Sequence, residues 1–206
     1  MLTKSGLAIK LSKLKVFDNP SFTDEQYPVD SEIAATILWD AFMSGNIENM
    51  TIADLGAGTG ILGIGAAMLG AKAVYFVEKD AKAIEILKQN LAEKFAELGK
   101  CETKIIFDDI KNFETKVDVV LENPPFGVKK AHADRIFLEK AFETADLIYS
   151  FHKSESTDFL KKFSNQHKFE LLKEQKFAFP LKQTMKYHTS KIRRINVSCY
   201  CFIKSN

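Results

Sequence analysis

The sequence predicts an α/β fold with a largely parallel β-sheet, and two observations lead to this prediction. From residue 51 onward, short apolar runs typical of strands alternate with longer segments of helical periodicity. Such an alternation builds a parallel sheet, because each helix carries the chain back to the edge where the next strand begins. The last two strand-like segments follow one another without a helix between them, so we expect them to pair antiparallel.

The residues before this alternation are predicted to be helical. Apolar spacing indicates a short helix over residues 7–16, and a loop with two prolines follows it. Asp30 or Ser31 is expected to cap a second helix that runs through Phe42. A short polar side chain at such a position accepts a backbone N–H of the first helical turn.

The elements of the alternating region follow in order along the chain. Apolar runs predict strands, and apolar residues spaced three to four apart predict helices. The expected strands are residues 51–55, 73–77, 104–107, 117–121, 147–151, 169–179 and 192–203. The expected helices are residues 60–69, 133–145 and 154–166, together with a long helix that Asp80 caps and that runs through Leu91.

The composition is that of an ordinary folded protein: of 206 residues, 46% are hydrophobic and 27% are charged. No stretch approaches the roughly 20 apolar residues that cross a bilayer, and the N-terminus lacks the apolar centre of a signal peptide. We therefore expect a soluble, cytoplasmic protein with no membrane partner. The three cysteines form no CxxC pair, so neither a disulfide framework nor a bound metal is expected.

Positive charge is concentrated near the two ends of the chain, although the net charge is only +2. Residues 1–17 carry four lysines and no acid, and residues 182–194 carry three lysines, two arginines and no acid. If the two segments meet in space, they predict a rim that binds phosphate groups. Separately, each is typical of a solvated surface.

A glycine-rich loop joins the first strand of the alternation to the following helix. Glycine lets the backbone approach a ligand closely, and the N-terminus of the helix offers free N–H groups. About 20 residues further on, Glu78 ends the next strand, where a carboxylate can bind both ribose hydroxyls. This arrangement predicts a site for a nucleotide-type cofactor, and its residues are Asp54, Gly56, Gly58, Gly60 and Glu78.

Two cofactors fit this loop. Residues 58–63 match the dinucleotide fingerprint and Glu78 lies at its acidic position, so NAD is one candidate. Asp54 favours S-adenosylmethionine, because its carboxylate can meet the methionine ammonium but would repel a pyrophosphate. Asp109 follows the third strand, where a carboxylate can accept a hydrogen bond from the adenine amino group. Its neighbour Asp108 is equally compatible with a solvated turn.

The segment Asn123-Pro124-Pro125-Phe126-Gly127 follows the predicted strand 117–121. An aromatic amine donates its lone pair into its ring and is a poor nucleophile. The Asn123 side-chain oxygen and the Pro124 carbonyl can each accept one N–H, which lets the nitrogen pyramidalise and face a methyl donor. The prolines fix the carbonyl, and Phe126 can stack on a base for ~1–3 kcal/mol. We predict Asn123, Pro124, Pro125 and Phe126 as catalytic residues, with a proline-rich turn as the structural alternative.

Together, these residues resemble the class I S-adenosylmethionine-dependent methyltransferases, and more narrowly those with an Asn-Pro-Pro-aromatic motif. The chain is most similar to the methyltransferase-like family of archaeal and eukaryotic N6-adenine ribosomal RNA methyltransferases. Residues 25–28 resemble the pre-core motif of this family, residues 149–154 a stretch after its fifth strand, and residues 179–194 its terminal hairpin. The resemblance implies a Rossmann-like sheet of seven strands with an antiparallel last strand and helices on both faces.

The resemblance also implies the organisation of the chain and the roles of its residues. One methyltransferase domain would span residues 1–206, with 1–48 as a helical extension and 49–206 as the catalytic core. The implied donor site consists of Gln26, Tyr27, Asp54, Gly56, Gly58, Gly60, Glu78, Asp109 and Asn123. Eukaryotic members modify small-subunit ribosomal RNA together with a small zinc-binding activator protein. RNA and such a subunit are therefore the expected partners, and adenine N6 is the expected target.

Several positions depart from the family pattern or carry no assigned role. Glu122 stands where the family usually has an apolar residue, which indicates a charge at the edge of the core or a modified pocket. Ala57 and Gly58 replace cysteines often found in eukaryotic members, which leaves the need for an activator open. His152 and Lys153 are compatible either with contacts to RNA phosphate or with an ordinary surface pair at a strand end.

Four other functions are compatible with parts of the sequence. A DNA adenine or cytosine amino-methyltransferase would use the same pocket, but it usually carries a sizeable recognition domain. A protein glutamine methyltransferase more often has tyrosine where this chain has Phe126. An NAD-dependent oxidoreductase leaves the Asn123 loop unexplained, and a non-catalytic scaffold has no need of Asp54, Glu78 and Asn123.

Overall fold

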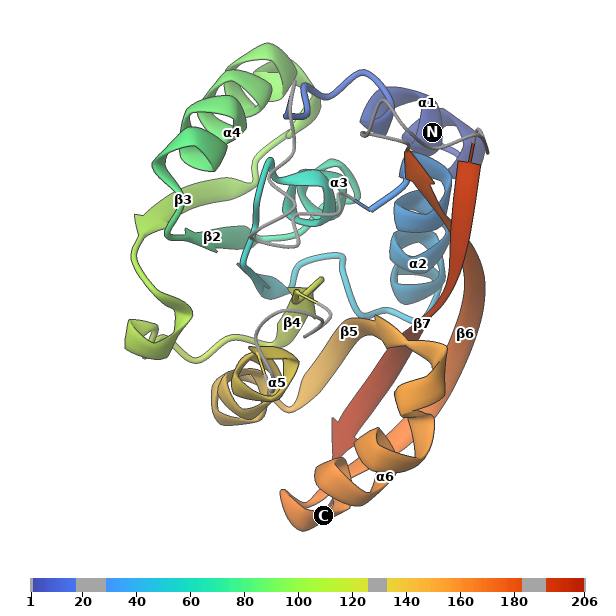
Figure 1. Ribbon diagram of the computed structural model, residues 1–206. Coiled ribbons are helices and arrows are strands. Elements are labelled where there is room, and N and C mark those ends of the chain that lie inside the picture. Colours follow the sequence, from blue (N-terminus) through green and yellow to red (C-terminus); the bar gives the residue numbers. More distant parts are fainter. Residues whose placement is uncertain (1, 18–28, 126–132, 183–191, 206) are drawn as a thin grey trace.

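The computed structural model describes residues 2–17, 29–125, 133–182 and 192–205, which form one seven-stranded β-sheet with helices around it (Figure 1). The strand order is β3-β2-β1-β4-β5-β7-β6. The strands are β1 Thr51–Leu55, β2 Ala73–Glu78, β3 Glu102–Phe107, β4 Val119–Glu122, β5 Leu147–Lys153, β6 Phe169–Lys182 and β7 Ile192–Lys204. Neighbours among β1 to β5 pair parallel, whereas β7 runs antiparallel between β5 and β6. The predicted sheet and its antiparallel last strand are confirmed.

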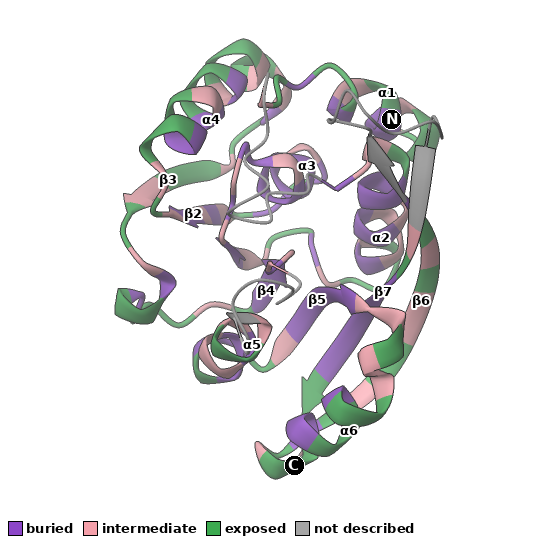
Figure 2. Ribbon diagram, viewed as in Figure 1, coloured by how far each residue is buried: buried purple, intermediate pink, exposed green. Residues whose placement is uncertain are grey.

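Helices cover both faces of this sheet, as the sequence predicts (Figure 1). One apolar cluster receives side chains from α1 (Lys4–Leu11), α2 (Ser31–Met43), α3 (Ile61–Met68) and α4 (Ala81–Lys94). A second cluster receives them from α5 (Ala133–Thr144) and α6 (Thr157–Gln166). Figure 2 shows that buried residues gather on α2, α3 and the strands β5 and β7. In the described part of the chain, no helix is long and apolar enough to cross a membrane.

Two helix caps are those that the sequence predicts. Asp30 caps α2 by accepting the backbone N–H of Glu32 at 2.9 Å. Asp80 caps α4 in the same way through the N–H of Lys82 at 2.8 Å. In both helices the carboxylate satisfies a donor that has no partner within the helix, so the chain starts each helix at a defined residue.

Two helices differ from the prediction by more than one residue at an end, whereas α3 and α5 differ by at most one. The first begins at Lys4 and ends at Leu11, whereas residues 7–16 were expected. The side chain of Thr3 accepts the Gly6 N–H at 3.1 Å, and this local cap sets the earlier start. The predicted helix 154–166 is divided, because Ser154–Ser156 form a 3-10 turn (η4) and α6 begins only at Thr157.

The carboxyl ends of four parallel strands meet at one edge of the sheet. Leu55 at the end of β1 pairs with Val77 of β2 on one side and with Glu122 of β4 on the other. Glu78 at the end of β2 pairs with Phe107 of β3. The loops after these strands therefore lie side by side, at the edge where open α/β sheets bind ligands.

Candidate active site

The glycine loop between β1 and α3 is packed at Gly56 and at Gly60, where a Cβ atom would lie 2.4 Å from Leu87, and it is open at Gly58. The φ angles of Gly56 and Gly58 are 68° and 55°, in the region that favours glycine. A Cβ atom on Gly56 would lie 2.7 Å from the Phe137 ring, so this glycine lets α5 pack closely on the loop. A Cβ atom on Gly58 would have the Gly56 carbonyl oxygen, at 4.0 Å, as its nearest described neighbour. The loop therefore offers room for a ligand at Gly58.

Asp54 lies at the base of this loop and is almost completely buried, with 2% of its surface exposed. Its Oδ2 accepts the backbone N–H of Gly63 in the first turn of α3 at 2.8 Å. Burial raises the pKa of Asp54 to about 7; the hydrogen bond from Gly63 opposes this shift, and the charge of Glu78 adds to it. Asp54 thus joins β1 to α3 and holds its proton near neutral pH.

Glu78 is hydrogen bonded to the glycine loop through its side chain. Its Oε2 accepts the Gly58 N–H at 2.8 Å, and its Oε1 accepts the N–H groups of Lys79 and Asp80, each at 2.8 Å. These bonds fix the carboxylate beside the open part of the loop. Oε1 is fully used by its two N–H donors, but Oε2 has a second lone pair, so Glu78 can still accept a hydroxyl group of a ligand.

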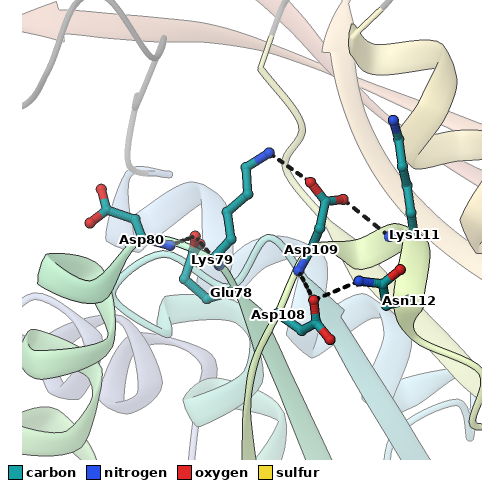
Figure 3. A network of polar contacts seen from close by, with 7 residues as sticks. All are labelled: Glu78, Lys79, Asp80, Asp108, Asp109, Lys111 and Asn112. Atoms are coloured by element: carbon teal, nitrogen blue, oxygen red, sulfur yellow. Dashed lines mark hydrogen bonds and ion pairs between the residues drawn. The ribbon is translucent and has the colours of Figure 1, made fainter.

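Asp109 lies at the end of the neighbouring strand β3 (Figure 3). It caps the 3-10 turn Ile110–Asn112 (η3) by accepting the Lys111 N–H at 3.2 Å, and it pairs with Lys79 at 2.9 Å. The hydrogen bond from Lys79 holds the pKa of Asp109 below its ordinary value. Asp108 is exposed and binds the Asn112 side chain at 2.7 Å. Lys79 therefore connects the ends of β2 and β3 through Asp109.

The Asn123-Pro124-Pro125 segment follows β4 directly. Asn123 and Pro125 are half-buried, and Pro124 is buried. Because Glu122 pairs with Leu55, this segment lies beside the start of the glycine loop. The structure thus brings together nine of the predicted site residues at one edge of the sheet, namely Asp54, Gly56, Gly58, Gly60, Glu78, Asp109, Asn123, Pro124 and Pro125.

Several predicted residues fall outside the described part of the chain. These are Gln26 and Tyr27 of the pre-core motif, Phe126 of the catalytic motif and residues 183–191 of the second basic segment. In the first basic segment, Lys10 pairs with Glu97 and Lys15 with Glu93. The charges of these two lysines are therefore already balanced, which weakens the prediction of a phosphate-binding rim in this region.

The sequence interpretation missed a buried polar chain behind the Asn123-Pro124-Pro125 segment. Glu122 and Ser150 are completely buried, and the Ser150 hydroxyl donates to Glu122 Oε1 at 2.7 Å. The same hydroxyl oxygen lies 2.7 Å from Nε2 of His152. On the other side of the ring, Nδ1 lies 3.8 Å from Oδ2 of Asp134 in the first turn of α5.

The two surface interpretations of His152 are wrong, because only 1% of this residue is exposed. It points to the same face of β5 as Ile148, which belongs to the cluster under α5 and α6. The signal that could have identified it is the period of two along β5: Ile148, Ser150 and His152 share one face. Glu122 shares the corresponding face of β4 with Val120, so it is a buried residue and does not lie at the edge of the core.

The comparisons with known proteins agree with this geometry. The model of the methyltransferase small domain family matches residues 28–147, which is more than half of the chain. The chain belongs to this family and is an S-adenosylmethionine-dependent methyltransferase. The residues present fit this cofactor: the loop is open at Gly58, Glu78 stands beside it, and Asp54 places an acidic group nearby, which suits a cationic donor better than a pyrophosphate.

Relatives are found among archaeal and animal proteins. An uncharacterized protein of Methanocaldococcus jannaschii is 34% identical over 96% of this chain and 92% of its own length. The rRNA N(6)-adenosine-methyltransferase METTL5 of Danio rerio is 31% identical over 91% of this chain and 92% of its own length. The crystal structure of a candidate RNA methyltransferase from Pyrococcus horikoshii superimposes with a TM-score of 0.89, at 43% identity over 98% of both chains.

Proposed function

We propose that this methyltransferase acts on the N6 amino group of adenine in ribosomal RNA. The observation that carries the proposal is the position of Asn123 and Pro124 directly beside the glycine loop, which the pairing of Glu122 with Leu55 imposes. A segment suited to an aromatic amine thus adjoins a loop suited to a sulfonium donor. Relatives named as rRNA N(6)-adenosine-methyltransferases, each about 30% identical, support RNA as the substrate.

The proposed roles follow from the chemistry of each group. S-adenosylmethionine supplies a methyl group made electrophilic by its sulfonium, and Gln26, Tyr27, Asp54, Gly58, Gly60, Glu78 and Asp109 would hold it. Asn123 and the Pro124 carbonyl accept the two N–H groups of the target amine. Phe126 stacks on the base, and Pro125 restricts the loop. Orientation supplies most of the rate enhancement, and the nitrogen needs no strong base, because it loses its proton after it has become cationic.

The substrate can be tested by incubating the purified chain with labelled S-adenosylmethionine and with total RNA, DNA and protein from cells that lack the gene. Nucleoside mass spectrometry then identifies the product. We expect labelled N6-methyladenosine in one ribosomal RNA. Label in DNA or in glutamine would favour one of the other amino-methyltransferase functions. A zinc-binding activator subunit stays a prediction from the family resemblance, and its addition to an inactive preparation is the corresponding test.

Replacing Glu78 by alanine is expected to weaken S-adenosylmethionine binding by about 10- to 100-fold, the usual effect of losing a hydrogen bond to a charged group. The variant removes the acceptor for the Gly58 N–H and the proposed acceptor for ribose. Isothermal titration calorimetry measures the affinity. Asp108→Ala is the matched control, because Asp108 is an acidic residue at the neighbouring strand end whose side-chain partners among the described residues, Asp109 and Asn112, belong to its own turn. Equal affinity in Glu78→Ala and the control would remove Glu78 from the donor site.

A further inference from the structure

The buried polar chain connects both ends of the segment that contains the proposed catalytic motif. Glu122 immediately precedes Asn123, and Asp134 lies in the first turn of α5, at the other end of that segment. Between them, Ser150 and His152 of β5 form the link, with the 2.7 Å contacts on either side of the Ser150 hydroxyl. These side-chain contacts therefore fix the position of the start of α5 relative to the end of β4.

The number of protons shared by Glu122, Ser150 and His152 decides whether every contact of this polar chain is favourable. Ser150 has one hydroxyl proton, so it can donate either to Glu122 or to His152, but not to both. If it donates to Glu122, Nε2 of His152 must donate to Ser150. If Glu122 is protonated, it donates to Ser150, and Ser150 donates to Nε2. These two arrangements contain the same number of protons when His152 carries a proton on Nδ1 in both.

The link to α5 depends on that Nδ1 proton. With it, Nδ1–H faces the carboxylate of Asp134, and the 3.8 Å separation is an attractive ion-pair or dipole contact. If one proton is lost, the Glu122–Ser150–His152 bonds survive only with the remaining imidazole proton on Nε2. A bare Nδ1 lone pair then faces the Asp134 carboxylate, which is repulsive. The interaction with His152 also holds the pKa of Asp134 below its ordinary value.

We propose that Glu122, Ser150 and His152 share one proton and act as positioning residues, keeping the first turn of α5 against the end of β4 so that Asn123 meets the target amine. This role rests on the proposed function of Asn123. Loss of the shared proton releases Asp134 and slows methyl transfer, while Gly58 and Glu78 of the donor site keep their mutual hydrogen bond, so donor affinity is expected to change little.

The surroundings of the chain support a titration in the mildly alkaline range. Burial raises the pKa of Glu122 to about 8; the Ser150 hydrogen bond opposes the shift, and the charge of Asp134 adds to it. Among the described residues, two further titratable groups near this polar chain are Tyr200 of β7, whose ring centroid lies 6.0 Å from that of His152, and Glu174 of β6, whose charge acts on Tyr200. The raised pKa of Tyr200 keeps it neutral in this range.

The experiment compares the dependence of kcat on pH in four proteins at saturating donor and RNA. We expect the wild-type kcat to fall above a pH of about 8. In Glu122→Gln, the amide donates to Ser150 as the protonated acid does and cannot ionise, so kcat should stay level from about pH 7 to 9. Ser150→Ala removes the hydroxyl that links Glu122 to His152. In this variant kcat should be lowered about tenfold at every pH, with donor affinity and the KM for RNA little changed.

Ser164→Ala is the matched control, because Ser164 is a completely buried serine whose hydroxyl donates to the Lys161 carbonyl within α6, away from the polar chain. Its pH profile should follow the wild type even if its melting temperature falls. A flat wild-type profile, or the same alkaline fall in folded Glu122→Gln, would overturn the proposal.

A second measurement separates this proposal from the proposed function. Hydrogen exchange of the amides in the first turn of α5, followed by mass spectrometry without substrate and corrected for intrinsic rates, reports the link to Asp134 alone. We expect protection to decrease above pH of about 8 in the wild type and to stay constant in Glu122→Gln. If the exchange result is as expected but no label enters RNA, the assigned substrate is wrong and the contact between His152 and Asp134 still stands. Equal protection in the two proteins across this range would disprove the shared proton, whatever the substrate.

Discussion

Asn123→Ala is expected to lower kcat by about 10²–10³-fold while the affinity for S-adenosylmethionine stays within about threefold of the wild type. The side-chain oxygen of Asn123 is the proposed acceptor for one N–H of the target amine. Without it, the nitrogen lone pair remains delocalised in the ring and is not directed at the methyl group. Single-turnover kinetics with the ribosomal RNA substrate measure the loss, and calorimetry measures donor binding.

The matched control for this variant is Asn112→Ala. Asn112 is also an asparagine in a loop after a parallel strand, but its side chain binds Asp108 at the end of β3. Its turnover should equal that of the wild type. If Asn123→Ala lost donor binding and turnover to the same extent, Asn123 would be a residue of the donor site, and the assigned contact with the amine would be wrong.

Donor affinity is expected to fall about tenfold for each pH unit below 7, because one proton must leave Asp54 when a cation binds beside it. In the free protein, burial raises the pKa of Asp54 to about 7, so the group is neutral in mild acid. The methionine ammonium interacts favourably only with the ionised form. The dissociation constant should therefore decrease as the pH rises to about 7 and stay constant above it. Calorimetry from pH 5.5 to 8.5, in about six steps, resolves this slope.

Asp54→Asn separates the charge from the geometry. The amide oxygen can still accept the Gly63 N–H that Asp54 now binds at 2.8 Å, so α3 should keep its position. We expect weaker and pH-independent donor binding in this variant, with an affinity close to that of the wild type at pH of about 5.5. Asp118→Asn is the control, since Asp118 accepts the Thr51 N–H at 2.8 Å at the opposite end of β1. A flat wild-type affinity over this range would exclude ionised Asp54 from donor recognition.

Much of the fold was predictable because its signals are local. Asp30 and Asp80 precede apolar periodic segments, and a capping carboxylate acts within three residues of its own position. The antiparallel end of the sheet followed from two strand segments with no helix between them. The start of α1 was missed because the Thr3 cap lies four residues before the first leucine of the apolar pattern.

The candidate site was predictable as a set of loops but not as a set of contacts. Position at or just after the carboxyl end of a parallel strand was enough to group Asp54, Glu78, Asp109 and Asn123. The bond from Gly58 to Glu78 depends on how two strands align, which the sequence of either strand does not contain. The burial of Glu122 and His152 was missed for a related reason: charged side chains near strand ends are usually exposed, and here α5 and α6 cover that face.

The burial of Asp54 and Glu122 has a thermodynamic consequence for the whole protein. In the unfolded chain these groups ionise near their ordinary pKa values of 3.8 and 4.5, whereas in the folded protein they keep their protons up to about 7 and 8. Unfolding at neutral pH therefore releases protons, and the free energy of unfolding falls by about 1.4 kcal/mol per pH unit for each group across its window. The fold is thus more stable in mild acid than in mild alkali. A cation bound beside Asp54 offsets part of this loss, so that cofactor occupancy contributes most to thermal stability on the alkaline side of neutrality.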